Sequence, residues 1–222
     1  LSYRGYDSSG IAILSGDELS FWKKAGKLHH LQDALKPLKI KGTVGIGHTR
    51  WATHGAPNET NAHPHISADK KFAIVHNGII ENHLSLKKKL IKEGYIFNSQ
   101  TDTEVIVHLI DRYMTNSLED AVEKATLDLE GSYAISVISE LDPHKLVVCR
   151  QGSPLIIGLG ENENFVSSDV NTVAAHTKKI IYLDDDEMGV IQQDAVSIHK
   201  RGGGKVDKKV HHISWDSESS EK

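Results

Sequence analysis

Apolar and polar residues alternate with different periods along the chain. Residues 10–76 contain short apolar runs typical of strands, interrupted by one amphipathic segment at 27–38. Residues 81–131 carry apolar residues at three- and four-residue spacing, which is typical of helices. Short apolar runs return from residue 132 to residue 199. This order of strands, helices and strands predicts an α+β fold with two sheets and helices packed outside them.

The predicted strands are bounded by turn residues such as Gly, Ser, Asp and Asn. They cover residues 10–14, 19–22, 44–48, 72–76, 132–139, 145–149, 155–159, 164–167, 180–183, 188–192 and 196–199. Four helices are expected over residues 27–38, 81–94, 101–114 and 117–131. Ser117 is placed to cap the last of them, and Gly94 and Gly131 are placed to end two of them.

Composition restricts the classes of partner. The 222 residues are 38% hydrophobic, enough for a substantial core, and we interpret them as one large domain. With 26 Lys and Arg against 30 Asp and Glu, the net charge is −4 and the basic residues are scattered, which argues against nucleic acid or an anionic membrane as a partner. The single cysteine, Cys149, fits a reducing compartment. No apolar run approaches the length of a membrane span, so a cytoplasmic location is expected.

Residues 45–82 hold an unusual concentration of polar and aromatic groups. They include five of the fourteen histidines, the pair Arg50-Trp51 and the pair Asn77-Gly78. A loop that only connects strands does not need such groups. We therefore interpret this stretch as the candidate binding site.

Asn77-Gly78 is first a hairpin signal, because both central residues of a type I′ turn need a positive φ. Local sequence favours this interpretation. A tight turn could also present the Asn amide and the Gly N–H toward one point, as an oxyanion hole requires.

Arg50 and Asp102 each admit two interpretations. Arg50 could stack on Trp51 or form a surface ion pair, or its guanidinium could hold a substrate carboxylate with two parallel hydrogen bonds. Thr53 and His54 would then lie in a mobile flap. Asp102 is most simply part of a helix N-terminus, and its alternative role is to bind an ammonium group.

The histidines allow a metal hypothesis as well. His48, His54, His63, His65 and His76 provide enough imidazoles for zinc. No His-Glu-x-x-His motif and no paired-cysteine spacing accompanies them, which makes a metal site the less favoured interpretation.

Five segments together resemble a known family. They are Y-R-G-Y-D-S-S-G-I-A at 3–12, G-H-T-R-W-A-T-H-G at 47–55, N-A-H-P-H at 61–65, H-N-G-I-I-E-N at 76–82 and T-D-T-E at 101–104. They resemble the glutaminase domain of glucosamine-6-phosphate synthases, the isomerising glutamine:fructose-6-phosphate aminotransferases, which are class II glutamine amidotransferases. Residues 152–155 and 164–169 fit the same domain, so the resemblance covers essentially the whole chain.

The resemblance implies the four-layer αββα sandwich of the N-terminal-nucleophile hydrolases. It implies that L-glutamine is hydrolysed to glutamate, and that the ammonia passes to fructose 6-phosphate to make glucosamine 6-phosphate. No cofactor and no metal are implied. Carried over by motif, the catalytic residues are Asn77, Gly78 and Arg4, and the substrate-binding residues are Arg50, Trp51, Thr53, His54 and Asp102.

The family also implies a cysteine nucleophile at the mature amino terminus, which the chain as given does not contain. Cys149 reads as a buried strand residue and is interpreted as structural. We therefore expect a truncated glutaminase domain at 1–213, inactive by itself, with a linker starting at 214–222 toward a sugar-isomerase domain that would also form a homo-oligomer. A non-catalytic glutamine-binding domain of the same fold is the alternative, and a metal-dependent hydrolase that uses the histidines is a more distant one.

Overall fold

The computed structural model describes residues 6–51 and 55–214, whose strands form three antiparallel sheets. The three-stranded sheet has the order β2-β1-β3, with β1 (Ser8–Ser15), β2 (Glu18–Ala25) and β3 (Val44–Arg50). The six-stranded sheet has the order β12-β11-β7-β6-β5-β4, with β4 (His65–Ile66), β5 (Phe72–Ile80), β6 (Gly131–Ser139), β7 (Leu146–Gln151), β11 (Glu187–Ile191) and β12 (Val196–Lys200). The four-stranded sheet has the order β13-β10-β8-β9, with β8 (Ile156–Leu159), β9 (Asn164–Ser167), β10 (Lys179–Tyr182) and β13 (His211–His212).

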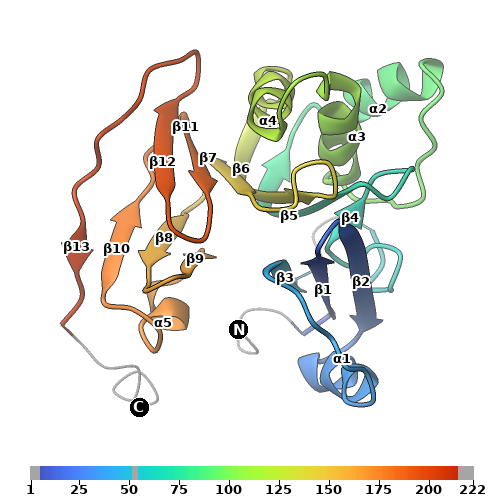
Figure 1. Ribbon diagram of the computed structural model, residues 1–222. Coiled ribbons are helices and arrows are strands. Elements are labelled where there is room, and N and C mark those ends of the chain that lie inside the picture. The colour runs from blue at the N-terminus through green and yellow to red at the C-terminus, as the bar shows by residue number, and fades with distance from the viewer. Residues whose placement is uncertain (1–5, 52–54, 215–222) are drawn as a thin grey trace.

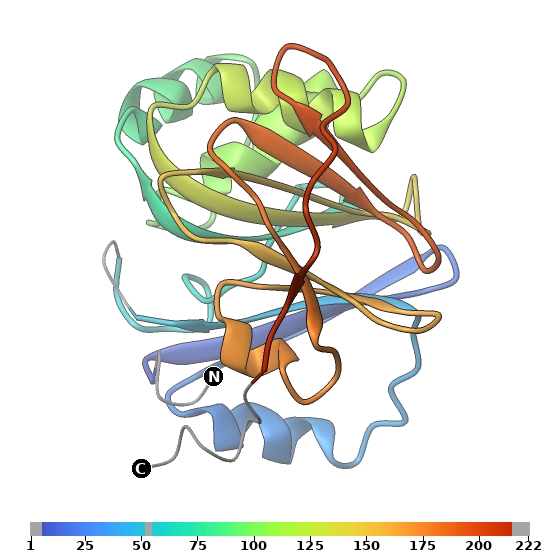
Figure 2. The same ribbon diagram turned by 90° about the vertical axis from the view of Figure 1, so that its left-hand side faces the viewer.

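The helices lie on the two outer sides of these sheets. The helices α2 (His83–Lys92), α3 (Glu104–Tyr113) and α4 (Leu118–Leu127) cover one face of the six-stranded sheet. The helix α1 (Leu28–Leu35) and the short α5 (Val170–Val173) lie outside the three-stranded and four-stranded sheets (Figures 1 and 2). Viewed from the side in Figure 2, the order is helices, sheet, sheets, helices. The predicted αββα sandwich is therefore confirmed, with its second β layer divided into two sheets.

The six-stranded sheet is buried on both faces, which explains why its strands read as apolar runs. Along β7, Val147 and Cys149 pack against the helices, whereas Leu146 and Val148 pack against the other two sheets. Successive side chains of a strand point to opposite faces, so a strand between two layers needs apolar residues at every position. The core is consequently two apolar layers separated by this sheet.

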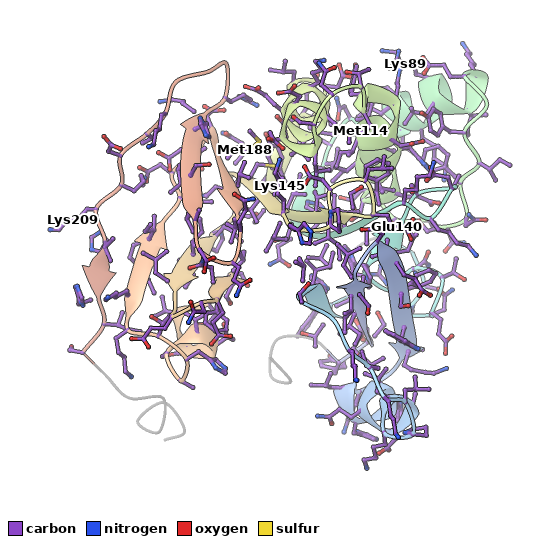
Figure 3. The ribbon with its side chains drawn as sticks, in the orientation of Figure 1. Lys89, Met114, Glu140, Lys145, Met188 and Lys209 are labelled. Carbon is purple, nitrogen blue, oxygen red and sulfur yellow. The ribbon has the colours of Figure 1, made fainter. Side chains whose placement is uncertain are left out.

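Polar side chains tie the layers at the ends of the strands. Glu140, directly after β6, accepts a hydrogen bond from the Leu19 N–H of β2 at 2.9 Å. Lys145, just before β7, forms ion pairs with Glu119 of α4 at 3.2 Å and with Asp142 at 2.8 Å. Figure 3 labels Glu140 near the upper end of β2 and Lys145 beside α4 and the six-stranded sheet.

The elements predicted from periodicity are present, and Ser117 caps α4 by accepting a hydrogen bond from the Asp120 N–H at 3.2 Å. The hairpin turn expected at Asn77-Gly78 is wrong. The strand β5 runs through both residues, which pair with Ala134 and Tyr133 of β6. Gly78 does have the positive φ that the motif suggests, 128°. That conformation occurs within a paired strand, so the chain does not reverse.

Gly78 is required by close contact with the neighbouring strand. A Cβ at this position would lie 2.1 Å from the Ser132 carbonyl oxygen. Since that atom belongs to the backbone of a central strand, it cannot move aside without disturbing the sheet.

Four histidines lie between the three-stranded and six-stranded sheets. They are His48 on β3, His63, His65 on β4 and His76 on β5. The His48 and His63 rings stack with centroids 4.3 Å apart, and the His65 ring meets the His63 ring edge-on at 4.9 Å. His65 Nε2 is 3.1 Å from Thr101 Oγ1, and His76 Nδ1 is 2.9 Å from Thr103 Oγ1. The cluster thus joins the two sheets to the segment that precedes α3.

Burial keeps these histidines neutral. It lowers the pKa of His65 to about 3, and it lowers the pKa of His63 well below its usual value. The pKa of His76 is also lowered by burial, against the opposing effect of Asp102. Each ring therefore serves as a neutral hydrogen-bonding and stacking group at physiological pH.

The protein should lose stability as the pH falls below about 6.5. Because the pKa values of His63, His65 and His76 are lower in the folded state, the unfolded chain binds more protons, and stability rises with pH. The stabilisation is complete above the pKa of histidine in the unfolded chain, near 6.5. It is lost as the pH falls toward the lower pKa values of the folded state. His48 and His65 alone, whose pKa values in the folded state are about 4 and about 3, correspond to roughly 2 kcal/mol between pH 6.5 and 5.5. Urea unfolding at these pH values measures it.

A matched pair of variants tests the source of this dependence. His65→Gln should reduce the pH slope by about one proton, whereas His29→Gln, at an exposed position on α1, should leave it unchanged. An unchanged slope in His65→Gln would contradict the assignment.

Gly78→Ala should destabilise the fold more than Gly94→Ala, which introduces backbone strain but no close contact. Gly94 also has a positive φ, 97°, but a Cβ there would meet no atom within 4 Å. Gly94→Ala should therefore lose roughly 1–3 kcal/mol, and Gly78→Ala about 1–3 kcal/mol more because of the contact with Ser132. Denaturant unfolding of both variants measures the difference, and equal losses would contradict the close contact.

Candidate functional site

A cavity of about 680 Å³ lies beside the end of β3, between the three-stranded and four-stranded sheets. One wall comes from β3, β5 and the segment before α3, and the other from the region of β8, β9 and α5. The lining includes five of the site residues predicted from the sequence, Arg50, Trp51, Asn77, Gly78 and Asp102. Segments far apart in the chain therefore share one cavity.

Arg50 is the last residue of β3, and it is only 4% exposed. Its guanidinium donates to the carbonyl oxygens of Ala56 at 3.3 Å and Gly55 at 3.4 Å. Burial lowers the pKa of Arg50, and the carboxylates of Asp7 and Asp102 act in the opposite direction. Since a guanidinium titrates far above neutral pH, Arg50 presents a fixed positive charge on the cavity wall.

Asp102 lies on the same wall and is 5% exposed. Its Oδ2 accepts a hydrogen bond of 2.8 Å from the Ile80 N–H at the end of β5. The helix α3 begins two residues later, at Glu104. The carboxylate thus lies directly before the N-terminus of α3 and is held by the backbone of a neighbouring strand.

A pair of amide side chains connects the surroundings of Arg50 and Asp102. Asn61 is buried, and its Nδ2 donates to the same Ala56 carbonyl oxygen that Arg50 contacts, at 3.0 Å. Its Oδ1 accepts from the Gln100 N–H at 2.9 Å, two residues before Asp102. Sequence reasoning did not assign a role to either amide. The Asn in the N-A-H-P-H segment was the available signal, but its hydrogen-bond partners are distant in sequence.

Asn77 and Gly78 face the cavity from β5. The Asn77 Oδ1 is 2.8 Å from the Nε2 of His48, which lies on the same cavity wall. A side-chain amide and a glycine N–H beside two opposite charges, those of Arg50 and Asp102, can recognise an α-amino acid that has a polar side chain. The guanidinium matches a carboxylate, and the Asp102 carboxylate matches an ammonium group.

Trp51 follows Arg50 and is 60% exposed. It contacts the Tyr6 ring edge-on at 5.2 Å and contributes to the cavity lining. The remaining predicted site residues, Arg4, Thr53 and His54, lie outside the described residues.

The histidine cluster does not form a metal site in the part of the chain that the structure describes. Within residues 6–51 and 55–214, no three His, Cys, Asp or Glu side chains are arranged to hold a metal ion. The rings of His48, His63 and His65 meet by their faces and edges. Such contacts do not direct several nitrogen lone pairs to one point.

Cys149 lies in the core between β7 and the helices and is not among the residues lining the cavity. Burial raises the pKa of its thiol to about 12. The thiolate that a nucleophile requires is therefore disfavoured, and the structural interpretation of Cys149 is confirmed. Among the described residues, no helix is long and apolar enough to cross a membrane.

Comparisons with known proteins agree with the geometry. Two curated relatives are named glutamine–fructose-6-phosphate aminotransferase (isomerizing). The one from Aquifex aeolicus is 50% identical over 100% of this chain and 38% of its own length, and the one from Clostridium acetobutylicum is 46% identical over 100% and 36%. The chain thus spans little more than a third of the length of these relatives.

Solved structures support the same fold. The glutamine phosphoribosylpyrophosphate amidotransferase from B. subtilis superposes with a TM-score of 0.76 at 28% identity, covering 90% of this chain and 44% of that one. A glutamine aminotransferase class-II domain protein from Silicibacter pomeroyi superposes with a TM-score of 0.64 at 14% identity, covering 88% and 91%, which supports the fold alone. The sequence model of a family described as "Glutamine amidotransferase domain" matches residues 24–202. Because that match spans most of the chain, the protein belongs to the glutamine amidotransferase domain family.

Proposed function

We propose that this chain is the glutaminase portion of a glutamine–fructose-6-phosphate aminotransferase. It would hydrolyse L-glutamine to glutamate and ammonia, and the ammonia would be used elsewhere in the longer protein to convert fructose 6-phosphate into glucosamine 6-phosphate. The observation that carries the proposal is that Arg50, Asp102, Asn77 and Gly78 line one cavity. The names of the relatives support the choice of sugar acceptor.

In this proposal Arg50 binds the α-carboxylate of glutamine and Asp102 binds its α-ammonium group. Both side chains are buried and held by backbone groups, so little conformational entropy is lost when the ligand binds. Trp51, with Thr53 and His54, would close over the bound amino acid. The side-chain amide of glutamine would then lie near β5.

At β5 the Asn77 side-chain amide and the Gly78 N–H would stabilise the oxyanion. As a thiolate attacks the amide carbon, the carbonyl oxygen becomes negative, and preformed N–H donors bind it more strongly than the neutral carbonyl. The proton removed from the thiol is transferred to the amide nitrogen, and collapse of the tetrahedral intermediate then releases ammonia and leaves a thioester. Water then hydrolyses the thioester to glutamate.

In this proposal Cys149 does not supply the nucleophile. Cys149 is enclosed in the core, and its thiol pKa of about 12 leaves almost no thiolate at neutral pH. We propose that a cysteine in a preceding segment of the longer protein supplies the thiolate, with Arg4 close to it. Residues 214–222 would begin the linker to the sugar-isomerase domain, through which the protein would assemble, and the cytoplasm stays the expected location.

A non-catalytic glutamine-binding domain remains the second candidate, because it would need the same charged pair. It differs from the enzyme in one measurable respect. The longer protein would bind glutamine and release no ammonia.

Removing either member of the charged pair should weaken glutamine binding. In the longer protein, Arg50→Lys should raise the KM for glutamine roughly 10- to 100-fold, since a lysine cannot form two parallel hydrogen bonds with a carboxylate. Asp102→Asn should have a similar effect, because the amide oxygen can still accept from Ile80 while the negative charge is lost. Steady-state glutaminase kinetics measure both.

Arg112→Lys is the matched control, because Arg112 pairs with Glu93 at 2.9 Å on the helical side of the molecule. It should leave the KM near the wild-type value. Wild-type KM values in the Arg50 and Asp102 variants would remove the basis of the proposal.

Cys149→Ala in the longer protein should retain most of the glutaminase activity, within about threefold, because the thiol does not reach the cavity. The 222-residue chain alone should release no ammonia from glutamine. An ammonia-release assay on both samples checks this. Loss of activity in a folded Cys149→Ala protein, or hydrolysis by the short chain, would show that the nucleophile assignment is wrong.

A further inference from the structure

His48 contacts the amide that the proposed mechanism requires. Its Nε2 is 2.8 Å from the Asn77 Oδ1, and both side chains lie on the cavity wall. His48 belongs to β3 and Asn77 to β5, so the contact crosses from the three-stranded sheet to the six-stranded sheet. One face of the His48 imidazole stacks on the His63 ring.

The protonation of His48 decides which way the Asn77 amide points. Its enclosed position lowers the pKa of His48 to about 4, so the ring is neutral and carries a single N–H. The Asn77 Oδ1 that lies 2.8 Å from Nε2 can only accept a hydrogen bond. The single proton of the neutral ring therefore belongs on Nε2.

With the proton on Nε2, His48 donates to the Asn77 Oδ1, and the amide cannot rotate by half a turn without placing two donors against each other. The Asn77 NH₂ group is thereby held on the side away from His48. An Asn amide in the opposite orientation would present its oxygen, which repels a developing negative charge. The stack with His63 limits the tilt of the imidazole and so fixes the direction of the hydrogen bond.

We propose that His48 is a positioning residue that orients the Asn77 amide, so that its NH₂ group faces the reacting carbonyl of the substrate. The inference rests on the proposed glutaminase function, and it assigns His48 no contact with the substrate. It predicts an effect on turnover with little effect on glutamine binding, because the charged pair of Arg50 and Asp102 is untouched.

The test compares two substitutions in the longer protein. His48→Leu removes the donor and should lower kcat about 10- to 100-fold, less than the full loss of an oxyanion donor, while the KM for glutamine stays within about threefold. His48→Gln places an amide nitrogen near the position of Nε2 and should restore kcat to within about threefold of wild type. The inhibition constant of glutamate, which needs only the charged pair, should be unchanged in both variants.

His108→Leu is the matched control for the loss of a buried histidine. His108 is buried in α3, between the helices and the aromatic rings of Tyr95 and Phe97, and does not line the cavity. It should leave kcat unchanged. A wild-type kcat in His48→Leu, or a kcat in His48→Gln as low as in His48→Leu, would overturn the inference.

A crystal structure of the His48→Leu protein separates this inference from the proposed function. The Asn77 amide should be reversed or spread over two orientations, which the hydrogen positions of a neutron structure distinguish, and an unchanged amide orientation would overturn the positioning role even if the kinetics change. If the wild-type protein hydrolyses no glutamine, the proposed function fails. The orientation of Asn77 in the His48→Leu structure still decides whether His48 orients the Asn77 amide.

Discussion

The site depends on holding two opposite charges, the Arg50 guanidinium and the Asp102 carboxylate, in one cavity with almost no exposure to water. Removing charged groups from water is unfavourable by several kcal/mol for each ion unless other groups replace the lost hydration. Here backbone atoms do so, with the Gly55 and Ala56 carbonyls at the cation and the Ile80 N–H at the anion. In the proposed function, a ligand with a carboxylate and an ammonium group would complete the compensation, which would favour amino acids over substrates with a single charge.

This arrangement explains why β5 is continuous. The strand must carry Asn77 and Gly78 past the cavity and still deliver the Ile80 N–H to Asp102. A hairpin at Asn77-Gly78 would reverse the chain before it reached Ile80. The close approach of Gly78 to Ser132 lets the strand stay paired with β6 throughout. The proposed oxyanion donors and the backbone group that holds Asp102 are therefore parts of one strand.

Periodicity predicted the strands and helices because each has an apolar face or two apolar faces to bury, as in β7. It could not place Asn77-Gly78, since a positive φ is compatible with a turn and with a strand under close contact. The motif resemblance named Arg50 and Asp102, but not Asn61 and Gln100, whose mutual hydrogen bonds join residues 39 apart. Polar contacts over such separations leave no repeat in the sequence. The role of the histidines was equally hidden, because stacking and metal ligation use the same residue type.

The enclosed thiol of Cys149 has a practical consequence for the intact protein. Because Cys149 is the single cysteine of this chain and lies under the helical layer, an alkylating reagent reaches it only when that layer separates from the six-stranded sheet. Its slow modification would report the frequency of core opening. Rapid modification of the longer protein would report thiols located elsewhere. One reagent therefore distinguishes transient opening of this core from the reactivity of other thiols.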